Sequence, residues 1–225
     1  MKVYWWRARP NFGDELTPLV LARFGVNVRW APPEEARLVA VGSVLEHLPD
    51  GWSGTLVGAG SINPRSTLPD LADARVLAVR GRLTRKRLGV RCAVGDPGIL
   101  APDLIEDRPD PAAGIEVAPH IDDRNMRWGC HLDLAADPLE VIHRIAGCDR
   151  LVSSSLHALV VADAFGIPHW WEPSPRVIGG SWKFDDYLSA FGLDAFPARE
   201  WRVTPAALMA DRQERLRSVL REVSA

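Results

Sequence analysis

Short apolar runs that alternate with helical segments constrain the fold of this chain most. Three of these runs, Leu38–Val41, Thr55–Val57 and Val76–Val79, each end at a glycine or a charged residue. Strands that are apolar on both faces are typical of parallel sheets with helices on both sides. A strand at Lys2–Trp6, followed by a helix from about Glu15 to Phe24, opens the same pattern. The sequence therefore predicts an α/β fold.

The segment from Glu106 to Gly114 divides this pattern in two. It contains three acids and two prolines and has no apolar periodicity, which is typical of a linker. A second series of strands and helices begins at Ile115. We therefore expect two parallel-sheet domains, residues 1–107 and 108–225, that face each other across a cleft. The last helix, about Thr204 to Val223, has a narrow apolar stripe, and we expect it to pack back across the hinge.

The composition excludes several classes of protein. Hydrophobic residues make up 47% of the chain and charged residues 25%, with a net charge of −2, which argues against general nucleic-acid binding. The sequence shows no secretory signal and no apolar run long enough to cross a bilayer. Cys92, Cys130 and Cys148 are odd in number and lack metal-finger spacing. These features predict a cytoplasmic protein with reduced thiols and no metal site.

The stretch from Arg150 to Pro168 is the strongest candidate for a binding site. A buried strand at Leu151-Val152 is followed by Ser153–Ser155 and then by a helix. This order directs hydroxyls, backbone amides and a helix N-terminus to one point, which attracts anions and above all phosphate. His157 lies in the first helical turn, off the apolar stripe, and is expected to face the same space outside the core. The alternative is an ordinary helix cap followed by a surface histidine, and the local sequence leaves both open.

Other candidates follow the predicted strands, at the edge of the sheet where ligands bind in such folds. Arg80 comes directly after a strand, where a guanidinium can hold a carboxylate or phosphate in two-point contact. Asp96 lies in a tight turn and either binds a substrate hydroxyl, orients the loop or only forms an Asx turn. The loop before the first helix is either part of a binding site or a capping turn with Asp14 as its cap. The remaining candidates for acceptor binding or loop shaping are Asn11, Gly60 and Ser61.

Seven segments occur in the order in which one known family has them. They are NFGDELTP (11–18), VGAGS (57–61), VRGRLTRKRLG (79–89), GDPGIL (95–100), PHIDD (119–123), SSSLHALVVADAFGIP (153–168) and WKFDDYLSAFG (182–192). Together they resemble the polysaccharide pyruvyl transferase family, and the last is similar to members that add pyruvate ketals to bacterial exopolysaccharides. The resemblance implies two facing Rossmann-like domains of the glycosyltransferase-B kind, with the site in the cleft.

The resemblance also implies the reaction and its partners. Phosphoenolpyruvate is the donor and a sugar diol, often on a lipid-linked oligosaccharide, is the acceptor, with no metal or other cofactor. Such an acceptor places the protein in the cytoplasm, in peripheral contact with the inner face of the membrane. The two halves are compact and leave little room for acceptor-binding insertions, so the identity of the acceptor stays open.

This chemistry needs a proton donor, a base for the sugar hydroxyls and cations for a small, highly charged donor. We expect His157 and His120 to be the acid/base pair, because histidine titrates unperturbed near neutral pH. Arg80 is expected to hold the donor carboxylate or phosphate, Ser153, Ser154 and Ser155 the phosphate, and Lys183 is a further anion contact.

Each of these assignments has a structural alternative. His120 could cap a loop with Asp122 and Asp123, and Lys183 could be a solvated helix start. The remaining histidines have no comparable setting and are expected to be structural: His47, His131, His143 and His169.

Two other functions remain open at this point. A nucleotide-sugar glycosyltransferase would share the architecture, and Glu172 after Trp171 could then hold the nucleotide ribose. A non-catalytic module that binds carbohydrate or anions is the second alternative.

Overall fold

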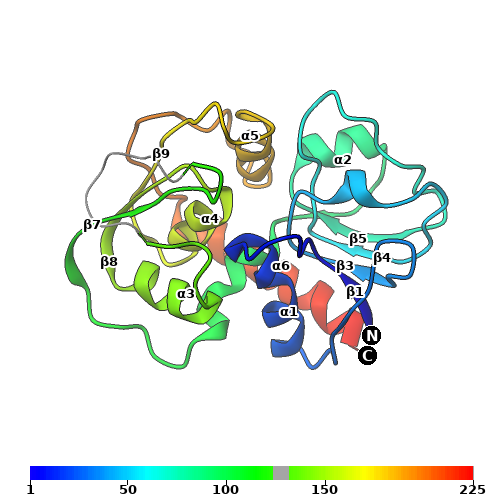
Figure 1. Cartoon of the computed structure of the whole chain (residues 1–225), viewed down its shortest axis with the longest axis horizontal. Helices are drawn as coiled ribbons and strands as arrows, with labels where there is room; N and C mark the ends of the chain where they lie inside the picture. The colour runs from blue at the N-terminus through cyan, green and yellow to red at the C-terminus, as the bar shows by residue number, and fades with distance from the viewer. Residues whose placement is uncertain (124–131, 225) are drawn as a thin grey trace.

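The computed structural model describes residues 1–123 and 132–224, and two parallel sheets organise them (Figure 1). The larger sheet has the order β2-β1-β3-β4-β5-β6 and the smaller one the order β7-β8-β9, with every neighbouring pair parallel. The strands are β1 (Lys2–Tyr4), β2 (Arg29–Trp30), β3 (Leu38–Val39), β4 (Thr55–Val57), β5 (Arg75–Val79), β6 (Ala93–Val94), β7 (Ala112–Ala118), β8 (Cys148–Ser153) and β9 (His169–Trp171). The predicted α/β class with parallel sheets is confirmed, whereas the glycosyltransferase-B arrangement and the domain boundaries stay predictions.

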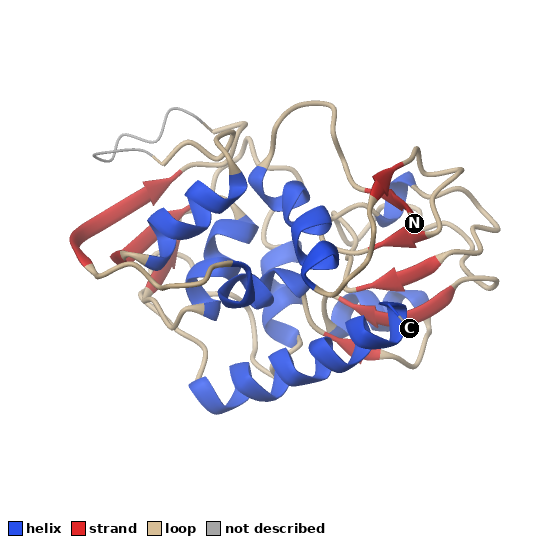
Figure 2. Ribbon diagram, turned by 90° about the horizontal axis from the view of Figure 1, so that it is seen from below, coloured by secondary structure: helices blue, strands red, loops and turns tan. Residues whose placement is uncertain are grey.

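Helices connect the strands and cover the sheets (Figure 2). The α-helices are α1 (Phe12–Arg23), α2 (Arg82–Leu88), α3 (Pro138–Ala146), α4 (Leu156–Ala164), α5 (Trp182–Ser189) and α6 (Ala206–Ser224), and the 3-10 helices are η1 (Leu45–His47) and η2 (Pro97–Leu104).

Four elements of the structure differ from the sequence-based expectation. The two-residue strands β2 and β6 were not expected, because two residues are too few to show a periodicity. Strand β7 begins at Ala112, inside the expected linker, and its register with β8 shifts between Ala112 and Ile115. Helix α1 begins at Phe12 with Asn11 in the N-cap position, so Asp14 lies in the first turn and is not the cap.

Helix α4 joins the two halves through a shared core. It is buried from Leu156 to Asp163 and packs against η2 and α1 from the first half as well as β8 and β9 from the second. One continuous cluster of buried apolar residues therefore runs through both halves. The position of α4 also fixes where the first turn of this helix lies relative to α1.

The last helix, α6, runs along the first sheet and ends beside it (Figure 2). It packs against β5, β6 and η2. The Arg217 guanidinium forms a two-point ion pair with Asp103, at 2.8 Å for each contact, and Arg212 donates to the Val94 carbonyl oxygen at 3.1 Å. Among the described helices, none has both the length and the apolar character that a membrane span requires.

Candidate active site

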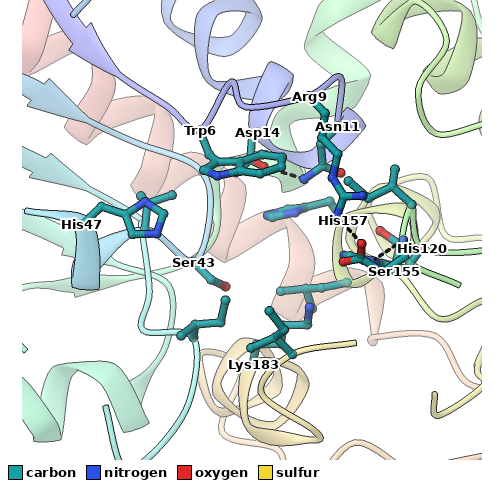
Figure 3. Close-up of a pocket in the computed structure, with 16 residues that line it drawn as sticks. Trp6, Arg9, Asn11, Asp14, Ser43, His47, His120, Ser155, His157 and Lys183 are labelled. Carbon is teal, nitrogen blue, oxygen red and sulfur yellow. Dashed lines mark hydrogen bonds and ion pairs between the residues drawn. The ribbon is translucent and has the colours of Figure 1, made fainter. Parts of the chain in front are cut away.

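A cavity of about 220 Å³ opens between the two halves (Figure 3). Its N-terminal wall consists of Trp6, Arg9, Asn11, Asp14, Ser43, Val44, His47 and Ile62. Its C-terminal wall consists of His120, Ile121, Asp122, Ser155, Leu156, His157, Ile178 and Lys183.

The position of the cavity follows from the parallel sheets. The loops that line it come after β1, β3, β4, β7 and β8, so the carboxyl ends of strands from both sheets face the same space. This is the edge at which parallel α/β sheets bind ligands. Helices α1 and α4 both begin there, and each directs its N-terminal turn towards the cavity.

The three serines before α4 have different roles. The Ser153 hydroxyl donates to the Ala118 carbonyl oxygen at 2.5 Å and accepts from the Ser155 amide at 2.9 Å. The Ser154 hydroxyl accepts from the His120 amide at 2.9 Å. Both side chains are fully buried and hold the two loops together, so Ser155 alone of the three lines the cavity.

The N-terminus of α4 offers hydrogen-bond donors to the cavity. Ser155 is in the N-cap position, but its side chain makes no capping bond to the helix, and the first turn contains no acid. The first amides of a helix have no partner within the helix, and its N-terminus carries a partial positive charge. This turn is therefore suited to bind an anion in the cavity.

Lys183, in the first turn of α5, supplies the cavity with a buried cation. Its side chain is 7% exposed, and its ammonium forms no hydrogen bond or ion pair with any residue in the described part of the chain. The pKa of Lys183 is lowered to about 8, mainly by burial and then by the nearby charge of Arg80, although Asp14 and Asp122 act in the opposite direction. Because an unpaired buried charge is costly, a bound anion would stabilise this side chain.

His157 lines the cavity but is not a surface residue. It is 8% exposed and lies in a helix that is buried on nearly all sides. Helices α1 and η2 pack against α4, including the side outside its apolar stripe, which was expected to face away from the core. The expectation that its ring lies outside the core is therefore wrong. Its Nε2 atom lies 3.3 Å from Oδ2 of Asp96, a fully buried carboxylate that does not itself line the cavity.

His120 lies beside Ser155 on the C-terminal wall (Figure 3). Its Nδ1 accepts from the Asp122 amide at 3.2 Å and lies 3.4 Å from the Asp122 carboxylate. Burial lowers the pKa of His120 to about 4, with Lys183 as the next contribution. The ring is therefore neutral at pH 7, and an accepting Nδ1 leaves the hydrogen on Nε2. The bond from the Asp122 amide to Nδ1 is the loop cap that was the structural alternative for His120. The Nε2–H group of the same ring remains able to donate a hydrogen bond.

Asp14 is a buried carboxylate on the N-terminal wall. Its Oδ2 accepts from the Asn11 side-chain amide, and both residues line the cavity. Burial raises the pKa of Asp14 to about 6, although His157, Asn11 and Lys183 act in the opposite direction. Among carboxyl groups, one with a pKa near 6 is well placed to exchange protons at neutral pH.

Arg80 is placed differently from the sequence-based expectation. It is fully buried behind the N-terminal wall, and all three guanidinium nitrogens contact protein groups. Nε donates to Asp186 at 3.0 Å, Nη1 to the Ser43 hydroxyl at 2.6 Å, and Nη2 to the Ser61 carbonyl oxygen at 2.7 Å. The guanidinium therefore binds three groups inside the protein, and the two-point contact expected with a ligand in the cavity is not made.

Gly60 and Ser61 belong to the same buried network and do not line the cavity. A Cβ atom on Gly60 would lie 2.4 Å from the central carbon of the Arg80 guanidinium, so the glycine makes room for that side chain. The Ser61 hydroxyl accepts from Arg87 and from the Trp182 indole, each at 2.9 Å. These residues support the wall from behind.

Several residues that line the cavity were not predicted from the sequence. His47, expected to be structural, lines the cavity and lies 2.6 Å from the Tyr4 hydroxyl through Nδ1. Trp6 and Arg9 follow β1, a position at which the strand-end rule could have found them. Ile178 lies in a loop without a periodic signal.

The other histidines give no further site. His169 is buried in β9, with its ring bound to Ile167 and Arg202, and His143 is exposed on α3. His131 lies outside the described residues. Within residues 1–123 and 132–224, no group of three or more His, Cys, Asp or Glu side chains is arranged to hold a metal ion.

Comparisons with known proteins confirm the family resemblance. Residues 63–172 match the sequence model of the polysaccharide pyruvyl transferase family. The chain is 29% identical to the succinoglycan biosynthesis protein ExoV of Rhizobium meliloti (strain 1021), over 88% of this chain and 67% of that protein. It is 33% identical to the uncharacterized protein L143 of Acanthamoeba polyphaga mimivirus, over 45% of this chain and 40% of that protein. No solved structure matches the chain significantly.

Proposed function

We propose that this relative of the polysaccharide pyruvyl transferases moves a pyruvyl group from phosphoenolpyruvate to a sugar diol. The observation that carries the proposal is Lys183, a buried cation without an ion-pair partner among the described residues, in a cavity that also receives the N-terminus of α4. A small donor with a carboxylate and a phosphate provides the anions that this arrangement lacks.

The donor binds to the C-terminal wall. Lys183, the Ser155 hydroxyl and the first amides of α4 are the cationic and donating groups there. They bind the phosphate and carboxylate oxygens, and the Nε2 hydrogen of neutral His120 adds a further donor. Because these groups belong to one wall, the enol carbon is left facing the N-terminal wall.

The reaction requires one proton to reach carbon and two to leave oxygen. His157 protonates the methylene carbon of phosphoenolpyruvate, which makes the enol carbon electrophilic. One sugar hydroxyl attacks that carbon and loses its proton to Asp14, the carbon–oxygen bond to phosphate breaks, and the second hydroxyl closes the ring. The products are the cyclic ketal and inorganic phosphate, which carries away the remaining proton.

Asp14 takes the base role that sequence reasoning gave to a histidine. His120 is a weak candidate for that role because its Nδ1 already accepts a backbone hydrogen bond and its pKa is low. Asp14 lines the opposite wall and has a pKa of about 6.

The acceptor is a sugar of a bacterial exopolysaccharide or of its lipid-linked precursor. The matching family is described as polysaccharide pyruvyl transferase, and ExoV, the relative that the chain matches over most of its length, is described as a succinoglycan biosynthesis protein. Trp6 and Ile178 line the cavity, and Ile178 is 63% exposed, so an apolar sugar face can enter between them. We place the reaction in the cytoplasm, at the inner face of the membrane.

The nucleotide-sugar alternative gains no support from its candidate residue. Glu172 does not line the cavity, and its carboxylate accepts from Arg199 at 3.0 and 2.8 Å. An acid that binds the ribose of a nucleotide would be expected to line the cavity and to have its carboxylate free.

The test is to incubate the purified chain with phosphoenolpyruvate and a panel of exopolysaccharide oligosaccharides. We expect phosphate release together with a product heavier than the acceptor by phosphoenolpyruvate less phosphoric acid. In a parallel thermal-shift screen, phosphoenolpyruvate should raise the melting temperature and UDP-sugars should not. Stabilisation by a UDP-sugar alone would contradict the proposal.

A further inference from the structure

The Asp96 carboxylate has one oxygen in use and one waiting for a donor. Its Oδ1 accepts from the Gly98 amide at 2.9 Å, which fixes the turn into η2. Its Oδ2 lies 3.3 Å from His157 Nε2, yet neither atom makes an aligned hydrogen bond with any described group. Both atoms are buried, so leaving them unpaired is costly. A small rotation of the ring removes both costs at once, and hydrogen bonds at catalytic sites are often long before the substrate binds.

Gly13 occupies the other side of the same ring. A Cβ atom at this position would lie 2.1 Å from Nδ1 of His157 and 2.7 Å from Cγ. Gly13 lies in the first turn of α1 and has no positive φ angle, so its backbone does not require glycine. Glycine in a helix costs about 0.5–1 kcal/mol relative to alanine. The close approach of the imidazole is therefore the reason that the structure offers for this glycine.

We infer that Asp96 is a positioning residue that holds the hydrogen of His157 on Nε2, while Gly13 makes room for the Nδ1 edge of the ring. Nδ1 is then the atom that exchanges a proton, and it lies beside the first turn of α1, where Asp14 lines the cavity. The assignment of a proton transfer to His157 rests on the proposed function, whereas the tautomer does not.

Both halves of the chain contribute to the orientation of His157. His157 belongs to α4 in the second half, but Asp96 and Gly13 both belong to the first half. The orientation of the histidine is therefore fixed only when the halves pack together, through contacts that do not involve substrate.

Asp96→Asn tests this arrangement with little change in shape. Asparagine still accepts from the Gly98 amide, but it presents an N–H group to Nε2 and so favours the hydrogen on Nδ1. In Ser-His-Asp triads the equivalent exchange lowers kcat by about 10⁴ because the imidazole adopts the wrong tautomer. We expect phosphate release to fall by about 10²–10⁴ in kcat, with the KM for phosphoenolpyruvate little changed.

The direct readout is nitrogen NMR of the His157 ring at a pH where it is neutral. The parent should carry the hydrogen on Nε2 and Asp96→Asn should carry it on Nδ1. Asp103→Asn is the matched control, because Asp103 lies on η2 but contacts Arg217, and both its kcat and the ring tautomer should equal those of the parent.

A parent ring with the hydrogen on Nδ1 would overturn the inference, even if Asp96→Asn fails to fold. So would an Asp96→Asn variant that keeps the parental kcat and tautomer. A parent that releases no phosphate contradicts the proposed function instead, because the ring tautomer is measured without phosphoenolpyruvate.

Discussion

The N-termini of α1 and α4 face the same cavity but are electrically different. The first turn of α1 contains Asp14 and Glu15, whose negative charges complement the positive end of the helix. The first turn of α4 contains no acid, and Lys183 on the same wall adds a positive charge. An anion is therefore attracted to the C-terminal wall. A hydroxyl that must lose a proton finds a carboxylate to accept it, Asp14, on the N-terminal wall. This difference supports our proposal that the donor and the acceptor bind on opposite sides of one cavity.

Two buried cations near the cavity show the same division between structure and ligand binding. Arg80 forms an ion pair with Asp186 at 3.0 Å, whereas Lys183 has no ion-pair partner in the part of the chain that the structure describes. A buried pair needs both members to be tolerated, while a buried single charge is retained at a cost to stability. Lys183 is therefore the cation with a reason to bind a ligand.

The largest effect is expected from His157→Gln. Glutamine keeps a donor for Asp96 but cannot exchange a proton, so phosphate release should fall by about 10²–10⁴. The melting temperature should fall only slightly, because glutamine still presents an N–H group to the buried carboxylate of Asp96. His143→Gln, on the exposed face of α3, is the control and should match the parent in both measurements. Unchanged phosphate release by folded His157→Gln would remove this residue from the mechanism.

Arg80→Met tests whether the paired cation serves the structure. The substitution leaves Asp186 buried without its cation, and removing one member of such a pair costs about 3–5 kcal/mol of unfolding free energy. Chemical denaturation provides the measurement. Arg75→Met breaks an exposed pair with Glu222 and should cost less than about 1 kcal/mol. Equal losses in the two variants would mean that the Arg80 pair adds no particular stability.

Asp14→Asn should give a smaller effect that depends on pH. The pKa of Asp14 is raised from 3.8 to about 6, so the folded chain holds this proton more tightly than the unfolded chain. The contribution of Asp14 to the free energy of unfolding is fully present below pH 4 and is lost as the pH rises through 6. The variant lacks this loss, so its advantage over the parent should grow from pH 4 to pH 6, up to about 3 kcal/mol.

Denaturation of the ligand-free protein at pH 4, 5, 6 and 7 measures this difference. Glu15→Gln removes the neighbouring acid of the same turn, which does not line the cavity, and should show no comparable growth. An advantage of Asp14→Asn that is the same at every pH would contradict a raised pKa.

Local signals in the sequence predicted the elements that local chemistry determines. Asp137 followed by Pro138 predicted the start of α3, and the Asp137 side chain does accept from the amides of Leu139 and Glu140. The apolar run of β4 has the predicted bounds. The short strands β2 and β6 depend on neighbours that lie elsewhere in the chain, and no local pattern shows them.

The candidate site shows the same limit. The sequence placed His120, Ser155, His157 and Lys183 near one space, because all of them follow strands or begin helices. Arg80 was predicted to bind a ligand because no local pattern shows its partner Asp186, which is 106 positions away in the chain. The sequence placed His157 outside the core for a similar reason, because α1 and η2 cover that side of α4 only in the folded protein.

Calorimetric titration of phosphoenolpyruvate measures directly whether the donor binds through the charge of Lys183. The parent should bind, and its affinity should fall as the pH rises through about 8, because Lys183 then loses its charge. Lys183→Met should bind about 10–100-fold more weakly at pH 7, and Lys86→Met, on the exposed face of α2, should bind like the parent. Equal affinity of Lys183→Met and the parent at pH 7 would show that the Lys183 charge does not bind the donor.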